Sequence, residues 1–547
     1  MDRYAALCER HDATVPETFN FGTDVVDAWA RDPVRNVAGP ALIWSNAEGA
    51  ERSYSFAEIA ALTDRLAAAL RRRGIGKGDR VLVMLPRIPA WQIAMVAVLK
   101  LGAVAIPCVT MLTEKNIAFR LENSGARAVI TTCAETGKLA GVSGLLRIAA
   151  NSALPPDAPD AFPVPPAGWL GLETLLAENA GDFTAATVGA EEPALIFYTS
   201  GSTGMPKGVT HAARGIHTWR GSAESWLDLG PGDVMYCTAD TGWSKAGTAI
   251  LFGPWSRGAA VLFHDGPFDP AMRLELLARH RVTVFCASAT ELRHLVVRPV
   301  TPGQFPALRL TVSAGESLNP PVQARWQALT ARPVLEAYGL TETLMLIANY
   351  RDCPIRRGAM GRALPGLSLD LITAQGELAA PGEIGQIALR LPCPQLMLGY
   401  WQDPARTEAA FAHVDGSDWF LTGDNARRDA EGYFYYEGRA DDIINSAGYR
   451  IGPQEVENAL LEHPAVREAA AVPSPDAERG EVVKAFVVLH GGHTGNPDLA
   501  KELQDFVKHL TAPYKYPRRI EFVTDLPRNA VGKIQRRALR AREFARE

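Results

Sequence analysis

The sequence predicts an α/β protein in which a large N-terminal domain is followed by a small α+β C-terminal domain. Helical spacings alternate with short β-branched runs over residues 55–132 and again over 272–338. From Ser368 onward the pattern changes to short alternating strands, and beyond Gly438 a further unit has its own helices and strands. The alternation of helix and strand indicates parallel-sheet α/β subdomains, and the short strands indicate a small β-rich subdomain.

The overall composition is typical of a soluble, globular protein with more than one domain. The chain has 547 residues, which exceeds what one hydrophobic core usually organises. It is 47% hydrophobic and 21% charged. A net charge of −5 argues against a nucleic-acid coat or a polybasic membrane anchor, because such a chain would not neutralise a phosphate surface. We therefore expect no nucleic-acid partner.

The cysteines and the N-terminus predict a cytoplasmic protein. The seven cysteines form no CxxC pair and their number is odd, which fits reduced thiols better than disulfides or a zinc site. Residues 1–10 lack the apolar core of a secretion signal and include acidic residues, which transit peptides avoid. The most apolar run, 91–112, contains Lys100, Gly102 and Pro107. A buried helix and strand explain this run better than stable membrane insertion does.

The N-terminal half should contain helices and strands in regular order. Residues 134–190 are rich in Ala, Pro and Gly and predict irregular surface with one short helix near 172–178. Apolar residues at helical spacing from Ile216 to Leu227 predict a helix that faces the core. The other expected helical segments are 62–70, 91–99 and 117–121, and the expected strands are 81–84, 104–106, 129–131, 234–236, 283–286 and 309–313.

Turn and cap residues predict the elements of the C-terminal half. Turns at 374–377 and 380–383 separate the short strands of the β-rich subdomain. Pro453 should open a helix that closes near His463, because proline is favoured in the first helical turn. A strand at 482–489, a helix at 499–510 and a strand at 520–523 complete the small domain.

The strongest functional signal is a strand followed by a run of hydroxyl and glycine residues. Glycines let consecutive N–H groups converge on an anion, hydroxyls add donors, and a lysine adds a mobile positive charge. Pro206 and Gly208 break the Walker pattern, so this would be a different kind of polyphosphate site; the alternative is a flexible surface loop. After the apolar residues 195–198 the run reads Thr199, Ser200, Gly201, Ser202, Thr203 and Gly204, with Lys207 shortly after.

This loop resembles the phosphate-binding loop of the acyl-adenylate-forming superfamily, which includes acyl-CoA synthetases, luciferases and peptide-synthetase adenylation domains. The resemblance extends over residues 50–540. Segments 443–453 and 511–518 are similar to the medium-chain acyl-CoA synthetase branch. Further motifs that resemble those of the superfamily follow in the same order at 337–343, 422–424, 438–444 and Gly532–Lys533.

The resemblance implies an ATP-dependent acid–CoA ligase that forms acyl-CoA through an acyl-AMP and acts in fatty acid metabolism. Thr341 and Lys533 resemble the groups that contact the α-phosphate, and Glu342 resembles the ligand of a magnesium ion. Asp424 and Arg439 resemble the pair that binds the ribose hydroxyls. The implied ATP site combines the loop with these residues and with Gly315, Glu316, Ser317, Glu336, Ala337, Gly339 and Tyr338, which would stack on adenine.

The second half-reaction needs coenzyme A, and the resemblance places much of its site in the small domain. Gly448 resembles the residue that leaves room for the thin pantetheine arm. Met111 departs from relatives that have glutamine near coenzyme A, which puts the large-domain side of the site in doubt. The implied CoA-binding residues are Ala447, Gly448, Tyr449, Arg479, Lys508, Tyr516, Pro517 and Arg518.

Domain alternation would serve the two half-reactions in turn. Lys533 and Gly448 cannot both face one acyl phosphate from a single pose, so the small domain should be mobile. Asp441 resembles the family's hinge residue, which divides the chain into domains 1–440 and 441–547; otherwise it is an ordinary surface carboxylate. Lys533 also resembles a lysine that is acetylated in related synthetases, which would make a lysine acetyltransferase a partner.

The acid substrate is expected to be larger than acetate. Acetate-specific relatives have a tryptophan where this chain resembles them at Gly339, and that side chain shortens their acyl pocket. Gly339 thus predicts a deeper pocket for a medium-chain, branched or aromatic acid. Two other functions stay open, an acyl-AMP ligase that loads a carrier-protein phosphopantetheine and a degenerate nucleotide-binding sensor. The implied acyl-binding residues are Trp243, Gly339, Thr341 and Arg450.

Overall fold

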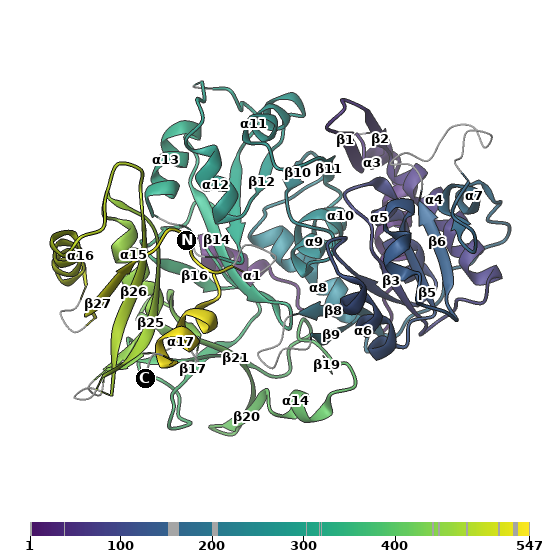
Figure 1. The fold of residues 1–547 in the computed structure, drawn as a ribbon. Coiled ribbons are helices and arrows are strands. Elements are labelled where there is room, and N and C mark those ends of the chain that lie inside the picture. The colour runs from purple at the N-terminus through teal and green to yellow at the C-terminus, as the bar shows by residue number, and fades with distance from the viewer. Residues whose placement is uncertain are drawn as a thin grey trace.

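The computed structural model shows three β-sheets among the residues it describes, two in the large N-terminal part and one near the C-terminus (Figure 1). The C-terminal sheet lies at the left of this view, and the N-terminal helices and strands lie mostly at the right. The described residues are 3–37, 39–150, 164–199, 206–301, 303–316, 318, 320–439, 442, 444–446, 449–476, 480–511, 515–528 and 534–545.

The first sheet has the strand order β19-β9-β8-β4-β3-β5-β6-β7 and is parallel from β8 to β7. Ser55 and Glu58 form a capping box that opens α4 (Phe56–Arg72). Gly125, with φ of 60°, closes α6 (Glu114–Ser124). The other elements of this layer are α5 (Pro89–Lys100), α7 (Leu172–Ala177), β3 (Arg80–Val83), β4 (Val104–Pro107), β5 (Ala128–Thr132), β6 (Leu146–Ala150), β7 (Leu170–Gly171), β8 (Pro193–Thr199), β9 (Lys207–Ala212) and β19 (Gly399–Tyr400).

Strands β6 and β7 correct the expectation that residues 134–190 form irregular surface with one short helix. Residues 146–150 pair in parallel with β5 and bury Ile148 in the core. A 3-10 helix, Cys133–Leu139, connects toward them. The local composition concealed this strand, because a short strand between alanine-rich segments is stabilised by its neighbour and not by its own pattern.

The second sheet joins the parallel α/β layer and the β-rich subdomain in one hydrogen-bonded array. Its order is β17-β18-β21-β22-β16-β15-β14-β13-β12-β10-β11-β1-β2, with β20 beside β21. Pairing is parallel from β14 to β1 and antiparallel from β14 to β17. The turn between β14 (Val334–Leu340) and β15 (Leu344–Ala348) therefore lies where the two kinds of pairing meet.

The helix that the sequence predicted to face the core packs against strands β8 and β9 of the first sheet. Helix α8 (Ala213–Ser225) buries Ile216, Trp219 and Ala223, and Trp226 is buried just after it.

The remaining strands are β1 (Leu42–Asn46), β2 (Glu51–Tyr54), β10 (Val234–Cys237), β11 (Ala260–Asp265), β12 (Val284–Cys286), β13 (Leu310–Ala314), β16 (Ala359–Ala363), β17 (Leu369–Ile372), β18 (Ile384–Arg390), β20 (Phe411–Val414), β21 (Ser417–Arg428) and β22 (Phe434–Arg439). The remaining helices are α1 (Arg3–Arg10), α2 (Ala28–Arg31), α3 (Pro33–Val37), α9 (Ser244–Ala246), α10 (Phe252–Ser256), α11 (Pro270–Arg279), α12 (Ala289–Leu295), α13 (Pro320–Thr330) and α14 (Pro404–Glu408), with π-helical turns at Gly22–Asp27 and Gly247–Leu251.

The third sheet forms the C-terminal unit and has a hydrophobic core of its own. Its order is β24-β23-β26-β25, with β27 parallel to β26. Val456, Leu460 and Leu503 lie in this core. Its elements are β23 (Ile444–Ser446), β24 (Tyr449–Ile451), α15 (Pro453–Leu461), β25 (Val466–Asp476), β26 (Gly480–Leu489), α16 (Pro497–Leu510), β27 (Arg519–Phe522) and α17 (Arg536–Phe544). Strand β25 and helix α17 were not predicted from the sequence.

The most apolar segment of the chain is buried helix and strand, as predicted. Lys100 at the end of α5 is fully buried and forms ion pairs with Asp27 at 2.7 Å and Asp64 at 2.5 Å. These partners satisfy a charge that would otherwise be very unfavourable inside the protein. Over the described residues, no helix combines the length and the apolar character needed to cross a membrane.

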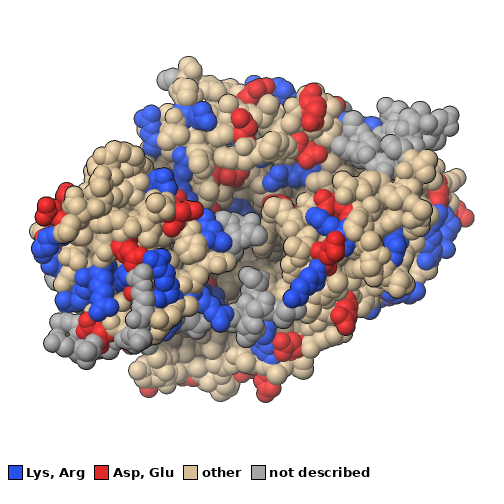
Figure 2. All heavy atoms as spheres, in the orientation of Figure 1, with Lys and Arg blue, Asp and Glu red and all other residues tan. Residues whose placement is uncertain are grey.

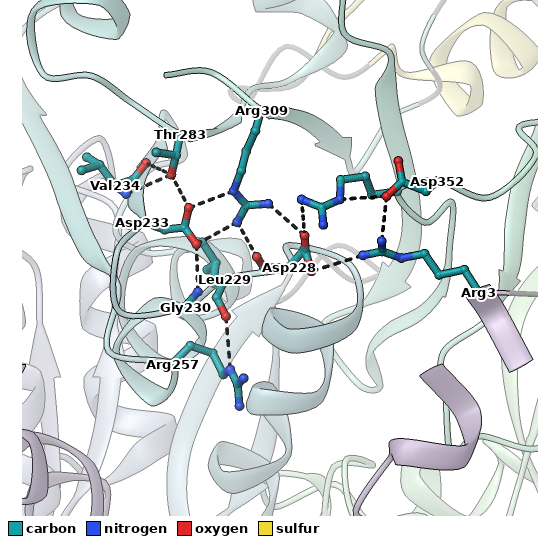
Figure 3. A network of polar contacts seen from close by, with 11 residues as sticks. Arg3, Asp228, Leu229, Gly230, Asp233, Val234, Arg257, Thr283, Arg309 and Asp352 are labelled. Carbon is teal, nitrogen blue, oxygen red and sulfur yellow. Dashed lines mark hydrogen bonds and ion pairs between the residues drawn. The ribbon is translucent and has the colours of Figure 1, made fainter. Parts of the chain in front are cut away.

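A network of charged residues fastens the N-terminal helix to the second sheet (Figure 3). Arg3 on α1 lies 2.7 Å from Asp352 and 3.5 Å from Asp228. Arg309, next to β13, pairs with Asp228 at 2.9 Å and with Asp233 at 2.8 Å. Because several charges share partners here, the network stabilises this corner more than isolated surface pairs would.

Candidate active site

Two connections between strands bring Lys207 and Glu342 together. Strands β8 and β9 form a hairpin in which Thr199 pairs with Lys207, so the hairpin holds both ends of the predicted phosphate loop. Lys207 Nζ lies 2.6 Å from Glu342 Oε1, and Glu342 is only 6% exposed. Burial raises the pKa of Glu342, but the Lys207 ammonium outweighs it and leaves the pKa below its ordinary value. The loop itself, Ser200–Gly204, lies outside the described residues.

Tyr400 is a third member of this group that the sequence did not reveal. Its hydroxyl lies 2.9 Å from Glu342 Oε1 and 3.0 Å from Lys207 Nζ, and the ammonium also lies 4.5 Å from the ring centroid. Tyr400 comes from the short strand β19, which pairs with β9. The Gly-Tyr-Trp run at 399–401 carries no local sign of this role, so only the tertiary pairing identifies it.

Thr341 is held from two sides by residues of the large domain. Its carbonyl accepts a hydrogen bond from His211 Nε2 at 2.7 Å, and its hydroxyl lies 3.3 Å from Ser244 Oγ. Burial lowers the pKa of His211 to about 4, so the ring is neutral at pH 7 and can donate through Nε2. His211 and Ser244 were not predicted. Together they orient the turn that carries Thr341 and Glu342.

The predicted ribose pair is formed by register partners on adjacent strands. Asp424 on β21 lies opposite Arg439 on β22, and Arg439 Nη1 is 3.3 Å from Asp424 Oδ1. The hydroxyls of Tyr338 and Tyr436 donate to the two oxygens of Asp424 at 2.7 and 3.2 Å. Burial raises the pKa of Asp424 and outweighs the lowering by Arg439. This carboxylate can accept hydrogen bonds from a diol.

The segment predicted to surround adenine is shaped by two glutamates. Glu336 accepts a hydrogen bond from the N–H of Leu318 at 2.8 Å, and burial raises the pKa of Glu336 to about 7. Glu316 accepts from the N–H and hydroxyl of Thr290 at 3.3 and 3.1 Å. Gly315, directly before Glu316, is exposed and has a φ of 97°. Ala337 is 8% exposed in β14. These contacts hold the loop conformation and leave the Gly315 backbone open.

The structure corrects the reason given for a deep acyl pocket at Gly339. A Cβ atom at this position would lie 2.1 Å from the carbonyl oxygen of Leu344 and 2.8 Å from Met345 Cα. The register of β14 and β15 shifts next to Gly339, which brings the two backbones together there. Gly339 is therefore required by close backbone packing, and its missing side chain opens no acyl cavity. Trp243, partly exposed, lies just before α9.

Three predicted CoA-binding residues form one cluster on the small domain. Lys508 Nζ lies 4.1 Å and Arg518 Cζ 4.9 Å from the ring centroid of Tyr516. Arg518 Nη1 also donates to the Tyr516 hydroxyl at 2.9 Å. Pro517 between them is buried. Two cations stacked about one aromatic ring can bind phosphate groups, Arg518 through its planar fork of donors and Lys508 as a mobile point charge.

Several predicted residues fall outside the described part of the chain, so their roles stay predictions. Met111, the position that departs from relatives, is described and is 61% exposed. The predicted residues that are not described are Ser200, Gly201, Ser202, Thr203, Gly204, Ser317, Asp441, Ala447, Gly448, Arg479 and Lys533, together with the side chains of Tyr449 and Arg450.

The residues present fit a magnesium ion that is bound jointly with phosphates. Both side-chain contacts to Glu342 converge on Oε1, and no other described side chain donates to Oε2. Mg²⁺ prefers oxygen ligands and commonly uses one or two carboxylates plus substrate phosphates. Among the described residues, no three acidic, His or Cys side chains converge in a way that could hold a metal ion.

Figure 2 shows acidic and basic side chains interspersed over the side of the molecule in view.

Comparison with known proteins agrees with this arrangement. A family profile described as "AMP-binding enzyme" matches residues 29–401, and one described as "AMP-binding enzyme C-terminal domain" matches residues 455–533. The chain is 38% identical over 560 residues to acyl-coenzyme A synthetase ACSM3, mitochondrial, from Homo sapiens, covering 99% of this chain and 92% of that protein.

Solved structures of similar proteins cover almost the whole chain. An anthranilate CoA ligase, AuaEII, in complex with anthranoyl-AMP has a TM-score of 0.84 at 27% identity, covering 97% of this chain and 98% of that one. A benzoate CoA ligase from Burkholderia xenovorans LB400 has a TM-score of 0.81 at 29% identity, covering 95% and 100%. The predicted superfamily is thereby confirmed, and the chain belongs to the AMP-binding enzyme family.

Proposed function

We propose that this protein is an ATP-dependent acid–CoA ligase. It would join a carboxylic acid to coenzyme A through an acyl-AMP and release AMP and pyrophosphate. The observation that carries this proposal is that β14 and the turn after it meet both charged pairs. Glu342 in this turn pairs with Lys207 on β9, and Tyr338 on β14 donates to Asp424, the partner of Arg439. Full-length similarity to proteins named acyl-coenzyme A synthetase supports the same reaction.

In the first half-reaction the acid carboxylate attacks the α-phosphorus and pyrophosphate leaves. This step replaces an oxide leaving group with a phosphate ester, so that a thiol can later displace AMP. Lys207 would bind the β- and γ-phosphates, and the Thr341 hydroxyl would donate to the α-phosphate. Asp424 and Arg439 would hold the ribose, and Tyr338 would lie beside the base. Lys533 would bridge the carboxylate and the α-phosphate.

A magnesium ion, held by Glu342 and the phosphates, would supply charge neutralisation while pyrophosphate leaves. The contribution of the protein is to keep that carboxylate ionised and aimed. The pKa of Glu342 lies below its ordinary value, so the group is ready to bind a cation at neutral pH. His211 and Ser244 keep the adjacent Thr341 in place through its carbonyl and hydroxyl.

In the second half-reaction the thiol of coenzyme A would attack the acyl carbon and AMP would leave. Lys508, Tyr516 and Arg518 lie together and offer two cations to the nucleotide phosphates of coenzyme A. A carrier-protein phosphopantetheine has no such nucleotide, so this cluster favours free coenzyme A. Asp441 as hinge between domains 1–440 and 441–547 would let the small domain present Lys533 first and Gly448 second.

For the acid we propose a medium-chain, branched or aromatic substrate. The support is the resemblance of segments 443–453 and 511–518 to medium-chain synthetases, together with the similarity to ligases of anthranilate and benzoate. Trp243, Thr341 and Arg450 would contact the acyl group. Because Gly339 is packed against the Leu344 backbone, chain length must be limited by other residues.

The compartment and the regulation follow from general features of the chain. All seven cysteines are free thiols, which fits a reducing compartment such as the cytoplasm, although curated relatives are named as mitochondrial. Acetylation of Lys533 by a lysine acetyltransferase would remove its charge and block adenylation.

One assay tests the reaction and the rival function together. Pyrophosphate release is measured over a panel of short, medium, branched and aromatic acids, with and without coenzyme A, and the thioester is identified by mass. We expect acid-dependent pyrophosphate release and acyl-CoA formation. Release without any acyl-CoA, but with acyl transfer to a carrier protein, would instead support the carrier-loading function. No release with any acid would contradict both.

A further inference from the structure

One segment contacts both strand β9, which begins with Lys207, and the turn that carries Glu342. Residues 394–401 run from the end of β18 to the edge strand β19, which lies beside β9 (Figure 1). The N–H of Leu398 donates to Thr210 O at 2.8 Å, and the N–H of Trp401 donates to Gly208 O at 2.7 Å. The N–H of Met397 donates to the carbonyl of Glu342 at 2.8 Å. This strap, residues 394–401, is bonded both to the strand of Lys207 and to the turn of Glu342.

Tyr400 is fixed within the strap by its neighbours. Its N–H donates to Thr407 Oγ1 at 2.9 Å. Gly399, with φ of 152°, brings the backbone so close to Thr407 that a Cβ atom would lie 2.9 Å from its methyl carbon. On the other side Trp401 Nε1 donates to the carbonyl of Asn123 at 3.1 Å. The Tyr400 backbone is thus held from both sides, and its ring has a defined direction toward Lys207 and Glu342.

The direction of each hydrogen bond in the Lys207–Glu342–Tyr400 group follows from the chemistry of its members. An ammonium can only donate and an ionised carboxylate can only accept. The Tyr400 hydroxyl therefore donates its single proton to Glu342 Oε1 and accepts from Lys207 Nζ, at 2.9 and 3.0 Å. The hydrogen bond from Tyr400 to Glu342 does not require Lys207 to stay in place, whereas the Lys207–Glu342 ion pair does.

We propose that Tyr400 is a positioning residue for the metal ligand Glu342. This inference rests on the proposed function, in which Lys207 binds phosphates and Glu342 binds magnesium. When Lys207 turns to the phosphates, Glu342 loses its ion-pair partner, and the Tyr400 hydroxyl remains on Oε1. That bond would keep the carboxylate from rotating and leave Oε2 available to hold a cation. Partners that orient a metal ligand in this way commonly contribute 10- to 100-fold, roughly, to metal affinity.

The test compares two variants that each remove one tyrosine hydroxyl. Tyr400→Phe removes the contact with Glu342. Tyr350→Phe is the matched control, because the Tyr350 hydroxyl donates to the main-chain carbonyl of Ala363 at 2.8 Å and touches neither Lys207 nor Glu342. ATP binding is measured by calorimetry without acid, so that no turnover occurs, over a range of magnesium concentrations. The Mg²⁺ dependence of pyrophosphate release is then measured with an accepted acid.

We expect Tyr400→Phe to raise the magnesium concentration for half-maximal ATP binding by about tenfold, and Tyr350→Phe to leave it unchanged. At saturating magnesium, kcat of Tyr400→Phe should return close to the wild-type value, which a general loss of structure would not allow.

Three outcomes would overturn the inference. An unchanged magnesium dependence in Tyr400→Phe would do so while leaving the proposed function intact, provided that the wild type binds ATP and releases pyrophosphate. Equal shifts in both variants would assign the effect to stability. If the wild type itself binds no ATP, the inference and the proposed function both fail.

Discussion

The two ends of the proposed nucleotide site each contain one carboxylate and one cation, yet they are built differently. At the triphosphate end, Lys207 and Glu342 lie 2.6 Å apart, and the pairing lowers the pKa of Glu342 despite its burial. At the ribose end, Arg439 and Asp424 lie 3.3 Å apart, and burial raises the pKa of Asp424 despite the arginine.

Under the proposed function, the difference follows from what each end would bind. A triphosphate and a metal ion bring their own charges, so the triphosphate end can keep its two charges paired until both ligands arrive. A ribose brings only neutral hydroxyls, so the ribose end must hold an acceptor ready. Tyr338 and Tyr436 do this by donating to Asp424, and Arg439 stays partly in solvent. Ionisation of Glu342 therefore stabilises the folded protein, whereas ionisation of Asp424 destabilises it.

The largest effect that we expect is a loss of activity in Glu342→Gln. This change keeps the shape but removes the charge that would hold magnesium and leaves Lys207 without its anion. We expect kcat/KM for pyrophosphate release to fall by about 10²- to 10³-fold, the scale of losing one group that stabilises the transition state. Asp424→Asn should act mainly through KM for ATP, by about tenfold, since neutral hydrogen bonds are weaker. Equal losses in kcat for both variants would erase the distinction between the ends.

The second prediction concerns Gly339, which lies on β14 between Tyr338 of the ribose end and Thr341 of the triphosphate end. Gly339→Ala would place Cβ 2.1 Å from the Leu344 carbonyl oxygen, so the β14–β15 pairing must shift. We expect destabilisation of about 2–4 kcal/mol and impaired ATP binding. The preference among acids of different length should stay the same. If Gly339→Ala folds normally and shifts that preference toward short acids, then Gly339 lines the acyl pocket after all.

Much of the fold was predictable because its signals are local. The strands and helices of residues 55–132 follow from the spacing of apolar residues within each segment. Ser55 and Pro453 indicate helix starts, because serine caps the first turn and proline is favoured in it. Strand β25 was missed because Pro473 and Pro475 argue against a strand, yet an edge position tolerates proline. Helix α17 was missed because its sequence is dominated by arginine and its few apolar residues give a weak pattern.

The candidate site was predictable only where motifs carry it. Asp424 and Arg439 were found through motifs, and the structure adds that they are register partners. Tyr400 and His211 were missed because their roles depend on contacts with residues 58 and 130 positions away. For Gly339 the motif was identified from the sequence. The direction in which a side chain at this position would point was not, because it depends on how β14 and β15 are paired.

A third prediction follows from the opposite pKa shifts and concerns stability at pH 7. Glu342→Gln should lower the free energy of unfolding by about 1–3 kcal/mol, because it breaks a largely buried ion pair whose lysine is partly exposed. Asp424→Asn should leave stability unchanged within about 0.5 kcal/mol or raise it, because it removes a charge that burial disfavours. Urea unfolding of both variants measures the difference, and a larger loss in Asp424→Asn would reverse the comparison.

The smallest expected effect is the pH dependence of those stability differences. Glu342 has a folded pKa below its unfolded value of 4.5, so its contribution is fully present above pH 4.5 and is lost as the pH falls through the folded pKa. Asp424 has a folded pKa above its unfolded value of 3.8, so its unfavourable contribution is present above the folded pKa and disappears as the pH falls toward 3.8.

Thermal unfolding between pH 7 and pH 4 should therefore give two opposite trends. As the pH falls, the advantage of the wild type over Glu342→Gln should be constant down to about pH 4.5 and should shrink only below it. Over the same range the wild type should gain stability relative to Asp424→Asn, whose amide does not titrate. The Tm differences are expected to be a few degrees or less, so each variant must be measured beside the wild type in the same buffers. Parallel trends in the two variants would mean that the carboxylates share one environment, and that the two ends are not built differently.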